Sequence, residues 1–319
     1  MLSTTLEWFS QGRWLIEPDA LRGLVRRVAQ VQTSDAQASM RAVRDLQSSP
    51  PIVGDVAVIG LTGPIVYRKS WLSDAMGMSA IEEVQAQFLA AVADTSVRAI
   101  VFRVDSPGGI VDMVPEFADL IYGARGTKPI IAVADVEICS AAYWLASQAD
   151  VIVATTSSQL GSIGAYRIHQ DISKYLEDEG VKITMIAHGA HKVEGNPYEP
   201  LAEDVQTRWQ QEVAEVGVEF EAAVARGRGV TRREVAERFG QGLVFRGRKA
   251  ISLGLADRFG SFGFALSRAT RLRADRGAGM TVAESFGNED DAPGERLAQD
   301  AGVDLSAHSV IDLRNASER

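Results

Sequence analysis

The chain has 319 residues, of which 46% are hydrophobic, with a net charge of −9 and one cysteine. This length and composition can bury a large core in one or two domains, and one cysteine excludes an internal disulfide. The acidic balance argues against a nucleic-acid-binding protein. No apolar run reaches the roughly 18 residues that span a bilayer, and Met1–Trp14 lacks the pattern of a signal peptide, so we expect a cytoplasmic protein without membrane partners.

Residues 1–51 are predicted to form an N-terminal helical arm followed by a linker. Leu21, Leu24 and Val28 fall on one face of a helix, and a polar stretch follows up to Pro50. We therefore expect this segment to precede a compact domain without belonging to it.

Residues 52–276 alternate between strand-like and helix-like segments, which predicts an α/β fold with repeated βαβ units and parallel strands. The predicted strands are Val53–Ile65, Arg98–Val104, Ile130–Val133, Val151–Ala154 and Val181–Ala187. The predicted helices are Val114–Gly123, the segment after Ser140, Ile172–Glu179, Leu201–Val224, Phe245–Asp257 and Phe262–Arg273. Capping boxes at Ser79–Glu82 and Thr231–Glu234 predict two further helix starts. The apolar stripe of 201–224 favours a core contact, with a subunit interface as the alternative.

Residues 277–319 differ in composition from the rest of the chain. Between Met280 and Arg319 there are nine acidic residues, three arginines and one aromatic residue, Phe286. So few large apolar groups cannot offset the entropy of ordering the segment. We expect a disordered acidic tail that acts as a scaffold or is removed by self-processing.

Three short motifs carry the chemistry. Ser140 follows a predicted strand and opens a predicted helix, where unpaired N–H groups can stabilise an oxyanion; by itself it could equally be a helix cap. Asp105-Ser-Pro-Gly-Gly109 ends another strand, and paired glycines let backbone N–H groups approach a ligand; we expect Asp105 to fix this turn. His188-Gly-Ala-His-Lys192 holds a lysine outside any evident charged surface.

Together with Gly161-Ser-Ile-Gly164, these stretches resemble the signal peptide peptidase A family of serine peptidases. The resemblance runs from about Ile52 to Arg268 and implies the ClpP/crotonase fold. It assigns Ser140 as nucleophile, Lys192 as general base and Ser162 as support for the lysine. It also implies an oxyanion hole built from backbone N–H groups of Gly108, Gly109 and Ala141, without metal or cofactor.

The resemblance carries two further expectations. Bacterial members have Gly-Gly after the nucleophile, whereas this chain has Ala141-Ala142, which predicts a narrower pocket with altered specificity. The family also forms homo-oligomeric rings, so that the nucleophile and base of one site can come from adjacent subunits.

A Ser–Lys pair works only when the lysine is neutral. Lowering a lysine pKa from about 10.4 to about 7 costs on the order of 4.6 kcal/mol, which burial in an apolar site can supply. We therefore predict that Lys192 is desolvated, has no carboxylate partner and is held by Ser162. Three rival sites remain open: a triad using His188 or His191, a zinc site at the same two histidines, and Cys139 as nucleophile.

The lack of a membrane anchor makes the chain similar to the phage branch of the family, which matures capsids. We therefore expect a Ser–Lys endopeptidase that cleaves capsid or scaffold proteins and can process itself. The alternatives are a bacterial cytoplasmic peptidase acting on signal peptides or oligopeptides, and a catalytically silent capsid assembly protein. An acyl-CoA enzyme of the crotonase type would not require both the serine and the lysine.

Overall fold

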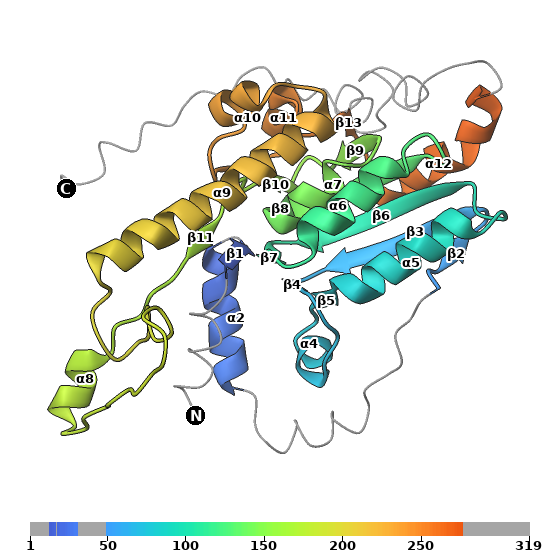
Figure 1. The fold of residues 1–319 in the computed structure, drawn as a ribbon. Coiled ribbons are helices and arrows are strands. Elements are labelled where there is room, and N and C mark those ends of the chain that lie inside the picture. Colours follow the sequence, from blue (N-terminus) through green and yellow to red (C-terminus); the bar gives the residue numbers. More distant parts are fainter. Residues whose placement is uncertain (1–12, 17, 31–48, 277–319) are drawn as a thin grey trace, which may run out of the picture.

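A computed structural model describes residues 13–16, 18–30 and 49–276 (Figure 1). The expectations for the 277–319 tail and for most of the linker lie outside the described residues. Among the helices within the described ranges, none has the length and apolar character needed to cross a bilayer.

The strands form two sheets, one of order β11-β1-β7-β4-β5 and one of order β12-β10-β8-β6-β3-β2, in which β9 joins β8 and β13 joins β9. The strands are β1 (Arg13–Ile16), β2 (Ile52–Val53), β3 (Val56–Thr62), β4 (Ile65–Val66), β5 (Ser79–Ala80), β6 (Ala99–Ser106), β7 (Gly108–Ile110), β8 (Ile130–Cys139), β9 (Val151–Ala154), β10 (Gln159–Gly161), β11 (Tyr166–Arg167), β12 (Val244–Arg246) and β13 (Arg258–Phe259).

The helices connect and cover these strands. They are α2 (Pro18–Gln30), α4 (Trp71–Ala75), α5 (Ile81–Ala93), α6 (Val114–Gly123), α7 (Ala141–Ala146), α8 (Ser173–Asp178), α9 (Glu203–Arg228), α10 (Arg232–Arg238), α11 (Gly247–Leu253) and α12 (Phe262–Arg276).

The larger sheet confirms the predicted βαβ repeats. β3, β6, β8 and β9 run parallel, and α5, α6 and α7 lie in the connections between them. The centres of these strands are apolar and buried on both faces, as in parallel sheets covered by helices on both sides. The α/β class and the alternating order therefore follow from the apolar runs in the sequence.

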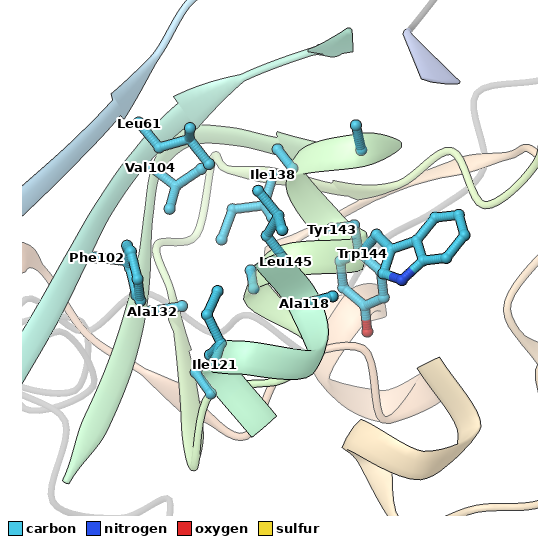
Figure 2. Packing of buried hydrophobic residues seen from close by; sticks show 14 of the residues in the cluster. Leu61, Phe102, Val104, Ala118, Ile121, Ala132, Ile138, Tyr143, Trp144 and Leu145 are labelled. Carbon is cyan, nitrogen blue, oxygen red and sulfur yellow. The ribbon is translucent and has the colours of Figure 1, made fainter. Parts of the chain in front are cut away.

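Each face of this sheet has its own apolar cluster. On one face Phe102 stacks against Phe88 of α5 and meets Phe117 of α6 edge-on, with ring centroids 5.7 Å and 6.4 Å away. Figure 2 shows Ile121 of α6 near Ala132 of the sheet, and Ala118 of α6 beside Tyr143 of α7. On the other face of the sheet, α12 covers the intervening residues of the same strands, such as Val101 and Val133. Figure 1 shows α12 on this face.

Helix α7 is packed deep in the first of these clusters. All six of its residues are buried, among them Tyr143, Trp144 and Leu145 (Figure 2). The Trp144 ring stacks on Phe220 of α9, with ring centroids 4.6 Å apart. The Tyr143 hydroxyl donates a hydrogen bond to the Leu255 carbonyl at 2.9 Å, and burial raises the pKa of Tyr143. Because α7 starts directly after Ser140, this packing fixes the position of that serine.

The smaller sheet includes a strand from the predicted N-terminal arm. β1 lies between β7 and β11 and is antiparallel to both. Trp14 and Ile16 pack with Leu21 and Leu24 of α2. Residues 13–16 thus belong to the same sheet as β7, although the sequence analysis placed them outside the domain.

Several local predictions are wrong in the described residues. Ser79 does not cap α5; its hydroxyl pairs with the backbone of Thr62 at 2.8 Å, and Ala80 occupies the cap position. Residues 181–187 form no strand, and the predicted helix 245–257 is divided into β12 and α11. The capping box at Thr231 is confirmed by both of its hydrogen bonds.

Candidate active site

Ser140 occupies a strained junction between β8 and α7. Its φ of 54° and ψ of −120° lie outside the regions that L-residues favour. Its side chain makes no capping bond to the helix, so it does not act as the ordinary cap that a lone serine suggests. Because such strain costs on the order of 1–3 kcal/mol, it persists where the surrounding structure imposes it, most often at functional sites.

Ser162 lies next to Ser140 because β10 pairs in parallel with β8. The register places Gly161 opposite Cys139, and the Ser140 N–H donates to the Gly161 carbonyl at 2.9 Å. Ser162 also has a positive φ, 55°, and its N–H donates to the Leu243 carbonyl at 2.8 Å. Two serines with strained backbones therefore follow neighbouring strands at the same edge of the sheet.

Gly108 brings the backbone of β7 against this edge. It has a φ of +97°, and a Cβ at this position would lie 2.8 Å from the Ser140 Cβ and 2.9 Å from the Ala141 nitrogen. Only glycine permits this approach. The first N–H groups of a helix have no carbonyl partner within the helix, so the Ala141 N–H is suited to bind an anion beside Gly108.

The turn before Gly108 is held by Ser106, which the sequence analysis did not single out. The Ser106 hydroxyl donates to the Gly63 carbonyl at 2.7 Å and accepts the Gly108 N–H at 3.3 Å. Asp105 contributes its backbone carbonyl, which accepts the Gly63 N–H at 2.8 Å. Burial, followed by repulsion from Asp135, raises the pKa of Asp105. The turn is thus fixed by Ser106, and the expected role of Asp105 is corrected.

Gly109 contacts the neighbouring strands β1 and β4, whereas Gly108 contacts Ser140 and Ala141. It pairs with Leu15 of β1 on one side and with Ile65 of β4 on the other, and a Cβ there would lie 2.0 Å from the Ile65 carbonyl oxygen. The absence of a side chain at Gly109 therefore allows three strands to meet beside the Ser140 junction.

We expect Gly108→Ala to destabilise the protein and abolish any activity at Ser140. The added methyl group would lie 2.1 Å from the Leu15 carbonyl oxygen, and the left-handed φ penalises any Cβ by about 1–2 kcal/mol more. Thermal unfolding should show a melting temperature lowered by several degrees. Gly60→Ala is the control, because a Cβ there meets no atom within 4 Å; equal melting temperatures for the two variants would contradict the prediction.

Lys192 is exposed in the described chain and does not meet Ser140 there. It lies in the segment between α8 and α9, where its N–H donates to the Gly189 carbonyl at 3.2 Å. Figure 1 shows this yellow-green segment extending away from the sheets, at the far end of α9 from α7. We predicted that the Lys192 amine is buried and held by Ser162, and the single chain does not show this.

An ion-pair cluster fixes the Lys192 segment to α9. Glu194 binds the His191 Nδ1 at 2.6 Å and the guanidinium of Arg208. The hydrogen bond from His191 is the main cause that lowers the pKa of Glu194, and Arg208 adds to it. The residues around Lys192 therefore have a defined conformation although they lie outside the main core.

We expect Glu194→Gln to loosen this segment and lower any activity that depends on Lys192. The pKa of Glu194 is lowered in the folded protein, so the ionised carboxylate stabilises this segment at pH values above the ordinary glutamate pKa. This stabilisation is lost as the pH falls through the pKa that Glu194 has in the folded protein. Activity of the wild type should therefore decline at acidic pH, with a smaller decline for the variant. Identical pH profiles would contradict this role, and Glu199→Gln, in the same segment, is the control.

The rival sites receive little support from the geometry. The His191 side chain is 72% exposed and bonded to Glu194, so it does not serve Ser140. Within the described residues no group of three or more potential metal ligands is found. Cys139 is fully buried one residue before Ser140. The residues gathered around the junction are thus Ser140, Ser162, Gly108 and the Ala141 N–H.

The segment that contains the Ser140 junction is similar to a known protein family. Residues 124–275, which run from the end of α6 into α12, match the model of Peptidase family S49. This segment, somewhat less than half of the chain, is similar to that family. It contains Ser140, Ser162 and Lys192, whereas Gly108 and β1 precede it.

Curated relatives extend the likeness. The chain is 35% identical over 206 residues to the "Head-tail preconnector protein GP5" of Enterobacteria phage P21, covering 65% of this chain and 41% of the relative. It is 34% identical over 206 residues to the "Capsid assembly protease C" of Escherichia phage lambda, covering 65% and 46%. "Protease 4" of Haemophilus influenzae is 28% identical over 254 residues, covering 75% and 39%. The chain thus spans less than half the length of each of these relatives.

Two solved structures, both of point mutants, are similar at lower identity. ClpP1 from Listeria monocytogenes has a TM-score of 0.41 and 12% identity, covering 64% of this chain and 91% of that one. The 1510-N membrane-bound stomatin-specific protease has a TM-score of 0.42 and 14% identity, covering 68% and 85%.

Proposed function

We propose that the chain is a serine endopeptidase with a Ser140–Lys192 dyad. The single observation that carries the proposal is the geometry of the Ser140 junction. There a serine with a strained backbone, at the start of a helix, lies against Gly108, at which any side chain would clash with its neighbours. The S49 match over residues 124–275 supports the reaction class. A serine, a base and backbone N–H donors are the parts that peptide hydrolysis requires.

In this mechanism the Ser140 hydroxyl attacks the carbonyl carbon of a peptide bond while the Lys192 amine takes its proton. The oxyanion that forms lies between the N–H group of Ala141 and the N–H groups of the Gly108–Gly109 strand. To bind the oxyanion, the Gly108 N–H must give up its long hydrogen bond to the Ser106 hydroxyl. The protonated lysine then gives the proton to the leaving amine. Water, deprotonated by the lysine, attacks the acyl carbon; the bond to the Ser140 oxygen then breaks, and this oxygen takes the proton back from the lysine as the new carboxyl group leaves.

We infer that the lysine of each site comes from a second copy of the chain. Lys192 is exposed on a segment that extends from the body of the protein, and a base must be desolvated to be neutral at physiological pH. Docking against another copy would bury the amine and bring it to that copy's Ser140 and Ser162. A ring is the closed arrangement of such head-to-tail contacts.

We propose that the substrates are capsid or scaffold proteins. The relatives named for capsid assembly in phage lambda and for the head–tail preconnector in phage P21 support this class, and the chain could also process its own tail. Among the alternatives, a cytoplasmic oligopeptide peptidase shares the same dyad, whereas a silent assembly protein would have no reactive serine.

The test is co-expression of the chain with candidate capsid and scaffold proteins, followed by intact-mass spectrometry. Defined cleavage by the wild type and none by Ser140→Ala would support the proposal. Cleavage only of short peptides would favour the oligopeptide peptidase. Failure of the wild type to cleave or to react with a fluorophosphonate probe, when folded and assembled, would favour the silent protein.

A further inference from the structure

Strand β1 fills a slot between two strands that flank the nucleophile. On one side Leu15 and Ile16 pair with Gly109 and Gly108 of β7. On the other side β1 pairs with β11, which follows the Ser162 motif. Without β1, the facing edges of β7 and β11 would present backbone donors and acceptors to any extended peptide.

The backbone of β1 passes directly beside Ser140. A Cβ built on Gly108 would lie 2.1 Å from the Leu15 carbonyl oxygen and 2.8 Å from the Ser140 Cβ, so these two atoms cannot be more than 4.9 Å apart. The same point is 2.9 Å from the Ala141 nitrogen. A carbonyl of β1 therefore lies within reach of the groups that would attack and stabilise a substrate carbonyl.

The side chains of β1 are also placed as those of a bound peptide would be. Leu15 points into the main apolar cluster, which also contains Ala141, Ala142 and Ile163. Trp14 and Ile16 point to the opposite face, where α2 covers them. Alternate side chains in pockets and a backbone bonded to two sheet edges are the features of peptide recognition by strand addition.

Ser140 is almost inaccessible in this arrangement. Its exposed fraction is 1%, and that of Ser162 is 7%. A serine that attacks a peptide bond must be reached by the substrate, so part of its surroundings has to move. β1 is the candidate because it is four residues long and held to β7 and β11 by short ladders.

We propose that residues 13–16 are an inhibitory strand that occupies the substrate slot of their own chain, so that a substrate strand binds only after β1 has left. The proposal rests on the proposed peptidase function. It also specifies the occupant that replaces β1: an extended segment antiparallel to β7, with an aliphatic side chain in the position of Leu15. A tethered strand has an effective concentration on the order of millimolar, so it competes strongly with a free peptide.

The first experiment locks β1 in place. Trp14 and Ile110 are directly opposite in the antiparallel ladder, where Cα atoms are about 4.5–5.5 Å apart, within the range of a disulfide. The full-length Trp14→Cys, Ile110→Cys variant is assayed on a fluorogenic peptide before and after oxidation, with each single variant as control. We expect oxidation to lower turnover of the double variant at least tenfold and a reductant to restore it. Turnover that is measurable and equal in the two forms would overturn the proposal.

The second experiment loosens β1 and measures binding without catalysis. In full-length Ser140→Ala, fluorescence anisotropy follows a labelled peptide with the sequence of residues 11–18. We expect Leu15→Ala to tighten binding at least fivefold and the oxidised lock to abolish it. A peptide with Asp in place of the leucine should bind at least tenfold more weakly.

The two readouts separate this inference from the proposed function. If the lock blocks peptide binding but the wild type cleaves nothing, the slot stands and the peptidase function fails. If the wild type cleaves peptides and the locked form binds and cleaves equally well, β1 is a structural strand and the inference fails. Absence of peptide binding to the Leu15→Ala form would also overturn it, provided that its circular dichroism spectrum matches that of the wild type.

Discussion

Ser140→Ala should abolish peptide hydrolysis and labelling by a fluorophosphonate probe. Removal of the nucleophile of a serine peptidase lowers kcat by about 10⁴-fold to 10⁶-fold, because the remaining groups can only bind and polarise the substrate. The variant should fold normally, since the Ser140 side chain makes no capping bond and the position is fixed by backbone contacts to Gly161 and Trp144. Thermal unfolding and labelling, measured on the same preparation, check both parts.

Ser147→Ala is the matched control for this prediction. Ser147 is also buried and lies at the other end of α7, where its hydroxyl donates to the Trp144 carbonyl at 2.8 Å. It also accepts from Gln148, whose amide retains the Trp144 and Ala223 carbonyls as acceptors. This variant should lose some stability but keep its labelling. Labelling of Ser140→Ala at the wild-type rate would exclude Ser140 as the nucleophile.

Lys192→Ala should be as inactive as Ser140→Ala, and mixing the two proteins should restore activity. If each site combines Ser140 of one chain with Lys192 of another, a mixed assembly contains sites with both native groups. Random reassembly of equal amounts restores about a quarter of the wild-type sites. The experiment requires dissociation and reassembly of the mixed proteins, with turnover measured per chain.

The outcome of mixing decides where the base comes from. Lys182→Ala, an exposed lysine in the same segment, should remain active and thus controls for loss of surface charge. No recovery from the mixture, although size-exclusion chromatography shows mixed assemblies, would mean that each chain uses its own lysine after a movement of the segment. Activity of Lys192→Ala alone would remove this residue from the dyad.

Much of the fold could be predicted because the apolar patterns are strong. The strands at 99–106 and 130–139 begin with apolar runs and the strand at 151–154 is apolar throughout, and the helix at 114–123 was predicted with its observed bounds. Ser79 was misassigned because a capping box in the sequence does not reveal that the serine hydroxyl has a strand partner at Thr62. The domain limits at 51 and 276 stay predictions.

The predicted strand 181–187 failed for a different physical reason. Its residues alternate as in a strand, yet a strand needs a neighbour to accept its hydrogen bonds, and the described part of the single chain provides none there. Several apolar side chains of the segment are exposed, including Ile186 at 97%. The same lack of a neighbour leaves Lys192 exposed, so both predictions need a contact that is not made within the described part of the single chain.

Residue type and periodicity are enough to predict the α/β class, the alternating strands and helices of the larger sheet, and the serines, glycines and lysine that resemble a peptidase site. Which of these residues lie together depends on strand pairing. Parallel pairing of β8 with β10 joins Ser140 to the Ser162 strand, and the close approach of β7 adds Gly108. Strand pairing also places β1 across the site, because it links residues far apart in the sequence through hydrogen bonds that no local pattern encodes.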